Sequence, residues 1–247
     1  MASNLLLLPQ GRTDPGPNNP RMNKSILTLL LSLSVSLVAS AANSTSKPSK
    51  LPFSDEFNRS DLGTHWRTHY ADLKIEDGVL KVGQDKAADH GAVLDTLVDF
   101  KDIELSFRFR FDGGKQFNVV IDDRNHKGSH AGHICRAVVR TDSISLGDDK
   151  TGIMENEIFA MRRDPKRKKE SEKLLKGKTQ RFPLTIADGE WQELVLIIKG
   201  NEMTASLNGK KVGSLTSEGI GHATKTDFGF TVPGRWVEFD DVKASQP

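Results

Sequence analysis

The sequence predicts an all-β protein, an antiparallel β-sandwich of the jelly-roll type with a short, basic helical insertion. Apolar and polar residues alternate along 103–111, which is the pattern of a half-buried strand. Asp77-Gly78 and Asn208-Gly209 each separate two alternating runs, and these pairs favour the type I′ turns of β-hairpins. Helical spacing of apolar residues is confined to one segment, near 155–178. Many short strands with few helices indicate a sandwich.

The strands are expected in chain order as follows. The first hairpin pairs 73–76 with 79–82 across Asp77-Gly78. The alternating strand 103–111 comes next. Further strands are expected at 116–122, 133–140, 143–146, 193–199, 203–207, 211–215, 227–232 and 236–242.

The segment 155–178 is the exception to this pattern. Met154, Ile158 and Met161 stand at helical spacing, and Pro165 is expected to interrupt the helix. Residues 162–181 hold ten basic side chains against three acidic ones. The segment is either a solvated surface element or a binding surface for an anionic polymer.

The chain of 247 residues is expected to begin with an export signal. From Met22, a plausible true start, Lys24 precedes an apolar stretch over 26–39 and small residues at the end, which is the pattern of a secretory signal peptide. Cleavage is expected after Ala41 or Ala42. The expected organisation is an upstream extension plus signal peptide over 1–41, a flexible linker over 42–52, and a jelly-roll domain over 53–245 with an insertion near 155–181. The mature protein would be periplasmic or extracellular.

The net charge and the length of the apolar stretch limit the kinds of binding partner that are expected. The formal net charge is +2, and removal of 1–41 leaves equal numbers of basic and acidic residues. A neutral chain lacks the general excess of positive charge that nucleic-acid binding requires, so no nucleic-acid partner is expected. The apolar stretch is shorter than the roughly 20 residues that a transmembrane helix needs, so no stable membrane span is expected after signal removal.

The densest polar segment is 122–133, which holds three of the seven histidines. His126, His130 and His133 are candidate ligands of a divalent metal, because imidazole and carboxylate groups are common ligands of zinc and similar ions. Asp122 is a candidate to orient a histidine or to bind the metal. On a strand, His130 and His133 would face opposite sides. A polar pocket without metal and an ordinary exposed loop are the alternatives.

A second polar cluster, Asp148-Asp149-Lys150, lies near Arg140. It is a calcium site, an acid/base pair or a solvated turn. If the two clusters meet, a histidine or Asp122 would act as the base, and Lys150 or Arg140 would stabilise negative charge.

Two tryptophans and the single cysteine are further candidates for binding or for chemistry. Trp66 and Trp236 are candidates for stacking on sugar rings, with packing in the core as the alternative. The single cysteine, Cys135, lies in a predicted strand, which favours a buried and unreactive thiol.

A family resemblance rests on a series of short segments: Asp61 to Trp66, Ile75 to Leu80, Phe100 to Leu105, Glu190 to Gln192, Leu207 to Gly209 and Val237 to Val242. These segments are similar to the framework of the 3-keto-glucoside lyase/hydratase-like (3-keto-disaccharide hydrolase-like) domain. The resemblance spans about 53–244 and implies a concanavalin A-like jelly roll and an exported protein. The family's Asn-Ser-Gly motif is replaced by Phe117-Asn118-Val119, so no catalytic residue is carried over.

Two functions follow as hypotheses. In the first, the protein is a carbohydrate lyase or hydrolase that acts on a glycoside or keto-sugar, with catalytic candidates His130, His133, Asp122 and Lys150, and ligand contacts from Arg140, Asp148, Asp149, Trp66 and Trp236. The keto-sugar is what the resemblance implies. In the second, it is a noncatalytic jelly-roll module that binds a glycan or another anionic cell-surface polymer.

Overall fold

The computed structural model describes residues 48–247. The predicted upstream extension and signal peptide, and the first part of the predicted linker, lie outside the described residues. Within the predicted linker, Ser49 donates its backbone N–H to the carbonyl of Leu97, at 2.7 Å. The end of this segment therefore contacts the folded domain.

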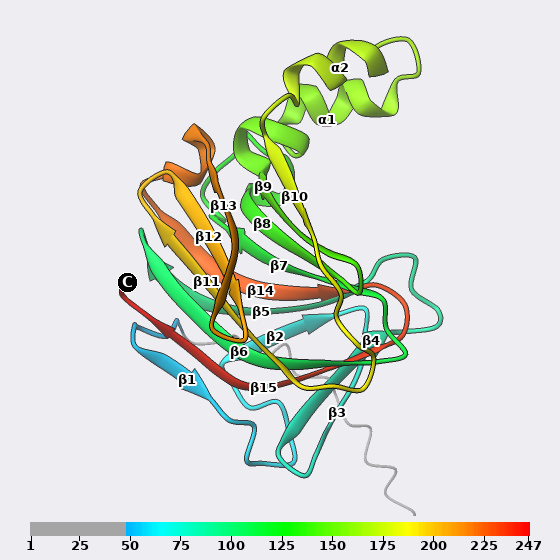
Figure 1. Cartoon of the computed structure of the whole chain (residues 1–247), viewed down its shortest axis with the longest axis vertical. Coiled ribbons are helices and arrows are strands. Elements are labelled where there is room, and N and C mark those ends of the chain that lie inside the picture. Colours follow the sequence, from blue (N-terminus) through cyan, green and yellow to red (C-terminus); the bar gives the residue numbers. More distant parts are fainter. Residues whose placement is uncertain (1–47) are drawn as a thin grey trace, which may run out of the picture. The chain divides into compact units, whose positions relative to one another are not determined.

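Two antiparallel sheets form the sandwich (Figure 1). The first sheet has the strand order β13-β12-β11-β6-β15-β4-β3, with β1 paired to β15. Its strands are β1 (Phe53–Asp55), β3 (Ala71–Glu76), β4 (Val79–Gln84), β6 (Ile103–Asp112), β11 (Gln192–Lys199), β12 (Glu202–Leu207), β13 (Lys210–Thr216) and β15 (Trp236–Ser245).

The second sheet has the order β10-β9-β8-β7-β14-β5-β2. Its strands are β2 (Trp66–His69), β5 (Ala92–Phe100), β7 (Gln116–Asp122), β8 (His133–Arg140), β9 (Ser143–Asp148), β10 (Thr179–Pro183) and β14 (Lys225–Val232). The two sheets confirm the predicted sandwich class. Neighbouring strands in each sheet often come from distant parts of the chain, as in a jelly roll.

Both predicted hairpins are confirmed by their backbone angles. Asp77 and Gly78 have φ of 52° and 76°, and Asn208 and Gly209 have φ of 50° and 74°. Two consecutive residues with positive φ are what a type I′ turn requires, and its twist matches that of the flanking strands.

Several strands have no counterpart in the sequence prediction. The strand β5 lies next to the edge strand β2, and three consecutive buried residues, 96–98, break the alternation of its apolar and polar side chains. At the edge of the sheet, β10 carries mostly exposed side chains. It overlaps the end of the predicted insertion, whose many basic residues hide the pattern of a strand.

Phenylalanine side chains from both sheets fill the centre of the core. Phe230 of β14 stacks on Phe239 of β15, with ring centroids 4.3 Å apart. Phe117 of β7 meets Phe239 edge to face at 5.2 Å. The alternation in β6 places Phe107 and Phe109 against the same cluster. These contacts join the two sheets.

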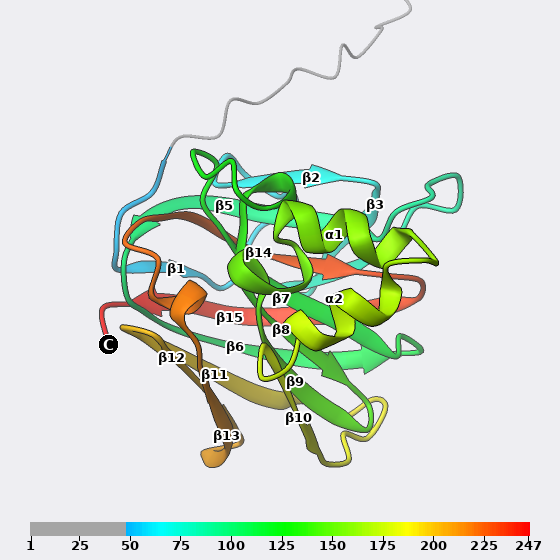
Figure 2. The ribbon, with the colours of Figure 1, turned by 90° about the horizontal axis from the view of Figure 1, so that it is seen from above.

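The insertion forms two helices, α1 (Asn156–Arg163) and α2 (Lys168–Leu174), separated near Pro165 as predicted. Figures 1 and 2 show them at one end of the second sheet, next to β8 and β9. None of the helices in the described part of the chain is long and apolar enough to cross a membrane.

Candidate functional site

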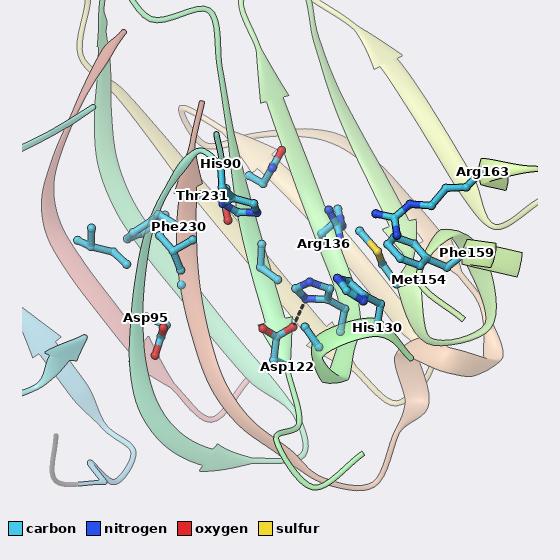
Figure 3. Close-up of a pocket in the computed structure, with 17 residues that line it drawn as sticks. His90, Asp95, Asp122, His130, Arg136, Met154, Phe159, Arg163, Phe230 and Thr231 are labelled. Carbon is cyan, nitrogen blue, oxygen red and sulfur yellow. Dashed lines mark hydrogen bonds and ion pairs between the residues drawn. The ribbon is translucent and has the colours of Figure 1, made fainter. Parts of the chain in front are cut away.

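A cavity of about 460 Å³ opens on the outer face of the second sheet, beside the insertion (Figure 3). Strands β5, β7, β8 and β14 form its floor, and residues from the 3₁₀ turn η1 (His130–Gly132) and from α1 line it as well. Alternation along β7 turns Asn118, Val120 and Asp122 outward to this face, while Phe117 and Val119 enter the core.

Asp122 and His133 meet at the bottom of the cavity. They end β7 and begin β8, and a register shift after Ile121 places Asp122 opposite His133. His133 Nδ1 lies 2.6 Å from Asp122 Oδ1. An ionised carboxylate only accepts hydrogen bonds, so Nδ1 carries the hydrogen and Nε2 keeps its lone pair. In the described part of the chain, His133 Nε2 makes no hydrogen bond, and it is free to take a proton from a ligand.

His130 lines the same cavity, although the sequence suggested that it would face away from His133. The reason is that His130 precedes β8, in the turn η1. Ala131 and Gly132 have φ of 55° and 81°, and a Cβ on Gly132 would lie 2.4 Å from the Asp123 carbonyl oxygen. The tight turn therefore requires glycine there. It holds the two imidazole rings 6.3 Å apart, centroid to centroid.

The pKa of His130 is lowered by partial burial and by the positive charges of His133 and Arg163. His130 is therefore neutral at neutral pH, and its ring can donate or accept a hydrogen bond.

Arg136 supplies an uncommitted donor to the cavity. Its Nε–H donates to Oδ2 of Asp149, which is completely buried behind the cavity. Burial raises the pKa of Asp149, and the positive charge of Arg136 opposes that effect. Arg136 Nη2 is buried and has no hydrogen-bond partner within residues 48–247, as is also true of Asp149 Oδ1. Arg136 lines the cavity, so the part of its guanidinium that is not buried can donate to a ligand.

Two further carboxylates extend from Asp122 across the sheet. Asp227 of β14 is the register partner of Asp122, and Asp95 of β5 lies nearby. Arg67 pairs with Asp95, and Arg124 lies 3.3 Å from Asp227. Burial, Asp122 and Asp95 together raise the pKa of Asp227 to about 7, against the effect of the two arginines. Negative charge thus accumulates at the β7–β14 side of the site.

The insertion supplies the opposite wall. The Phe159 ring is stacked against His130, with centroids 4.2 Å apart and planes at 14°. The Arg163 guanidinium lies 3.9 Å from the same ring centroid. Two groups this close to one ring cannot share a face, so Phe159 lies between them. Met154 completes this wall.

The three histidines proposed as metal ligands do not converge, which corrects that expectation. The ring of His126 faces His222, with centroids 5.0 Å apart, and His126 lines a different, shallower pocket. Within residues 48–247, no group of three or more His, Cys, Asp or Glu side chains is suited to hold a metal ion. Lys150 belongs to this second region, because its charge contributes to lowering the pKa of His126.

The residues of the second predicted cluster, Asp148-Asp149-Lys150 and Arg140, do not form one site either. Asp148 is fully buried and accepts hydrogen bonds from Thr151, Ser217 and Gly219. It therefore ties the loops together and is unavailable as a ligand contact. Arg140 ends β8, and His133 begins it. The length of the strand therefore separates Arg140 from the hydrogen-bonded pair of Asp122 and His133, which we call the dyad.

The two tryptophans have different positions. Trp66 is 1% exposed and donates its indole N–H to Asp55, so the expected role in sugar stacking is wrong for this residue. Trp236 belongs to the first sheet, and its indole lies over Gly83 in a separate pocket. The prediction of a buried Cys135 is confirmed, and burial raises the pKa of its thiol.

The sequence prediction did not include four cavity residues that shape the charge and the walls of the site: Asp95, Arg136, Phe159 and Arg163. Arg136 could have been predicted from the sequence, because alternation along 133–140 turns it to the polar face of the strand. Asp95 belongs to the unpredicted strand β5. Phe159 and Arg163 are brought to the cavity only by the docking of the insertion.

Comparison with known proteins agrees with this architecture. The family model of the 3-keto-alpha-glucoside-1,2-lyase-like domain matches residues 52–244. No curated protein matches the chain.

Solved structures resemble the fold at low sequence identity. The carbohydrate-binding module CBM66 from Bacillus subtilis is 12% identical with a TM-score of 0.51, over 74% of this chain and 96% of that one. The GH16 endo-β-1,3(4)-glucanase SCLam is 11% identical with a TM-score of 0.54, over 79% and 93%. A sialidase is 14% identical with a TM-score of 0.51 over 74% of this chain, which spans 17% of the sialidase's length.

Proposed function

Because the chain belongs to the family of the 3-keto-alpha-glucoside-1,2-lyase-like domain, we propose that it is an exported carbohydrate-active enzyme, a lyase or hydrolase acting on a glycoside or keto-sugar. The observation that carries the proposal is the hydrogen bond between Asp122 and His133 at the bottom of a cavity large enough for a sugar. Export is inferred from the predicted signal peptide and from the family resemblance.

The dyad is suited to removing a proton from carbon. A ketone at C3 of a sugar acidifies the C–H bond at C2, and a neutral imidazole is an effective general base near neutral pH. Asp122 holds the His133 ring in the tautomer that exposes Nε2, and it stabilises the imidazolium that forms when Nε2 takes the proton.

The negative charge that develops on the substrate needs a partner. As the C2–H bond breaks, charge passes to the ketone oxygen, and donors already oriented toward that oxygen lower the barrier. The guanidinium of Arg136 is placed to supply such a donor, because it lines the cavity and Asp149 fixes it through Nε. Collapse of the enolate expels the aglycone oxygen from C1 and leaves a C1–C2 double bond. The imidazolium of His133, which holds the proton taken from C2, gives it to the departing oxygen, and neutral His130, with its ring centroid 6.3 Å from that of His133, is placed to hydrogen-bond that oxygen.

The test uses a 4-nitrophenyl 3-keto-glucoside, whose released nitrophenolate absorbs visible light. His133→Gln is expected to lower kcat/KM by about 10²-fold or more, since general bases contribute about that amount. The matched control is His65→Gln, which changes an exposed histidine that hydrogen-bonds Ser49 outside the cavity. Unchanged turnover in His133→Gln, with the variant folded, contradicts the assignment of the base.

The alternative function is noncatalytic glycan binding, because the fold is also similar to that of a carbohydrate-binding module. The same fold hosts enzymes and binders, so the fold does not choose between them. Saturable sugar binding without turnover of any keto-glycoside, in parent and His133→Gln alike, would favour the binding module.

A further inference from the structure

The cavity wall formed by the insertion has a charge that the proposed chemistry does not use. Arg163 lines the cavity, is exposed, and forms no ion pair within residues 48–247. The other arginine of the wall region, Arg136, is neutralised by Asp149. Arg163 is thus the cationic group of this cavity that is not balanced by a carboxylate.

The guanidinium of Arg163 is held in place. It lies 3.9 Å from the centroid of Phe159, whose other face is covered by His130. Stacking on an aromatic ring orients a guanidinium without using its N–H donors, so the planar set of donors stays available to a ligand. Figure 3 shows the Arg163 side chain reaching from α1 toward the cavity.

The surrounding insertion adds to the positive potential. Of the ten basic residues in 162–181, only three, Arg167, Lys178 and Arg181, form ion pairs with described carboxylates. The negative charge of the site lies instead around Asp122, Asp95 and Asp227. The cavity is therefore polarised, positive at α1 and negative at β7 and β14.

We propose that the cavity selects a sugar that carries an anionic substituent, a carboxylate or a sulfate, and that Arg163 is the residue that binds this group. This inference rests on the proposed function for the placement of the sugar in the cavity, and it adds the substrate class. The anionic group contacts Arg163 at the α1 wall, while the reacting carbon lies at His133. Such a charge-assisted contact is expected to strengthen binding about tenfold or more.

Binding, measured without turnover, tests the proposal. The probes are methyl glucuronide, methyl galacturonide and methyl galactoside 6-sulfate, each compared with its neutral parent glycoside by NMR titration of the whole domain at low salt. At least one anionic probe is expected to bind about tenfold more tightly than its parent. The carboxylate and sulfate members distinguish the two sources of charge.

Arg163→Gln should remove that preference and leave the neutral parents unaffected. The matched control is Lys166→Gln, which removes a positive charge from the same insertion at an exposed position outside the cavity. Equal binding of anionic and neutral probes, a preference that survives in Arg163→Gln, or no binding of any anionic probe overturns the proposal. Turnover of neutral keto-glucosides in that case leaves the proposed function standing. Selective anion binding without any turnover supports the substrate class and contradicts the enzyme.

Discussion

At the scale of single residues, the cavity depends on how charge is balanced beneath it. Asp122 is within reach of Asp227 and Asp95, so three carboxylates share one patch of the second sheet. Arg67 and Arg124 compensate part of this charge. The raised pKa of Asp227 shows that the compensation is incomplete, and it makes the stability of the domain depend on pH.

The sign of that dependence follows from linkage. The pKa of Asp227 is about 7 in the folded protein, against an ordinary value near 3.8. The folded state therefore binds the proton more tightly than the unfolded state does. The stability that the protonated group contributes is fully present below pH 4 and is lost as the pH rises toward 7 and beyond.

Asp227→Asn should remove this loss. The variant is expected to equal the parent near pH 4 and to exceed it by about 2–4 kcal/mol in free energy of unfolding near pH 8. Urea unfolding at several pH values measures it, with Asp89→Asn in the exposed β4–β5 loop as the control. A constant difference between Asp227→Asn and the parent across this range would contradict the argument.

At the scale of elements, the insertion is attached to the sandwich by a few contacts. The backbone N–H of His130 donates to Met154, and that of Asn156 donates to Gly128, which ties the start of α1 to the loop before β8. Ile158 and Met161 are the buried apolar side chains of α1, and neither belongs to the core between the sheets. The insertion therefore has its own small apolar contact and is expected to open separately from the sandwich.

Met161→Ala should expose this separate opening. Loss of the buried side chain is expected to cost about 2–3 kcal/mol. Hydrogen exchange should accelerate in α1 and α2, while amides in β6 and β7 keep their protection. Equal acceleration throughout the domain would show that the insertion and the sandwich unfold together. Because Phe159 and Arg163 also belong to α1, the variant is expected to bind anionic sugars more weakly.

At the scale of the whole molecule, the phenylalanine cluster joins the two sheets beneath the cavity floor. Phe117 of the second sheet contacts Phe109 and Phe239 of the first, with ring centroids 4.9 and 5.2 Å apart. The same strand, β7, turns Asn118, Val120 and Asp122 to the outer face. Packing of the core therefore sets the position of Asp122, and with it the hydrogen-bonded pair of Asp122 and His133.

Phe117→Ala is expected to lower the free energy of unfolding by about 3–5 kcal/mol, because it opens a void between the sheets. Phe182→Ala is the control. This side chain is only partly buried, at the edge of the sandwich over Gly213, and its loss should cost clearly less. Thermal or denaturant unfolding compares the two, and equal losses would argue against Phe117 as a central contact.

The class of fold and much of the local structure follow from the sequence. Alternation along 103–111 and the two Asx-Gly turns depend on neighbouring residues, so they can be recognised without knowing what lies across the sheet. The segment 122–133 and the break at Pro165 were identified for the same reason. Strand β5 was missed because three consecutive buried residues, 96–98, interrupt its alternation near a register shift in its pairing with β14.

Which of the candidate residues lie together depends on contacts between distant parts of the chain. Asp122 and His133 were both candidates, but their contact depends on the register shift between β7 and β8. His126 and Lys150 were equally plausible in sequence, and the chain places them elsewhere. Arg136, Phe159 and Arg163 reach the cavity through the sheet order and the docking of α1. Sequence patterns report the neighbours of a residue along the chain, whereas a site is made of neighbours in space.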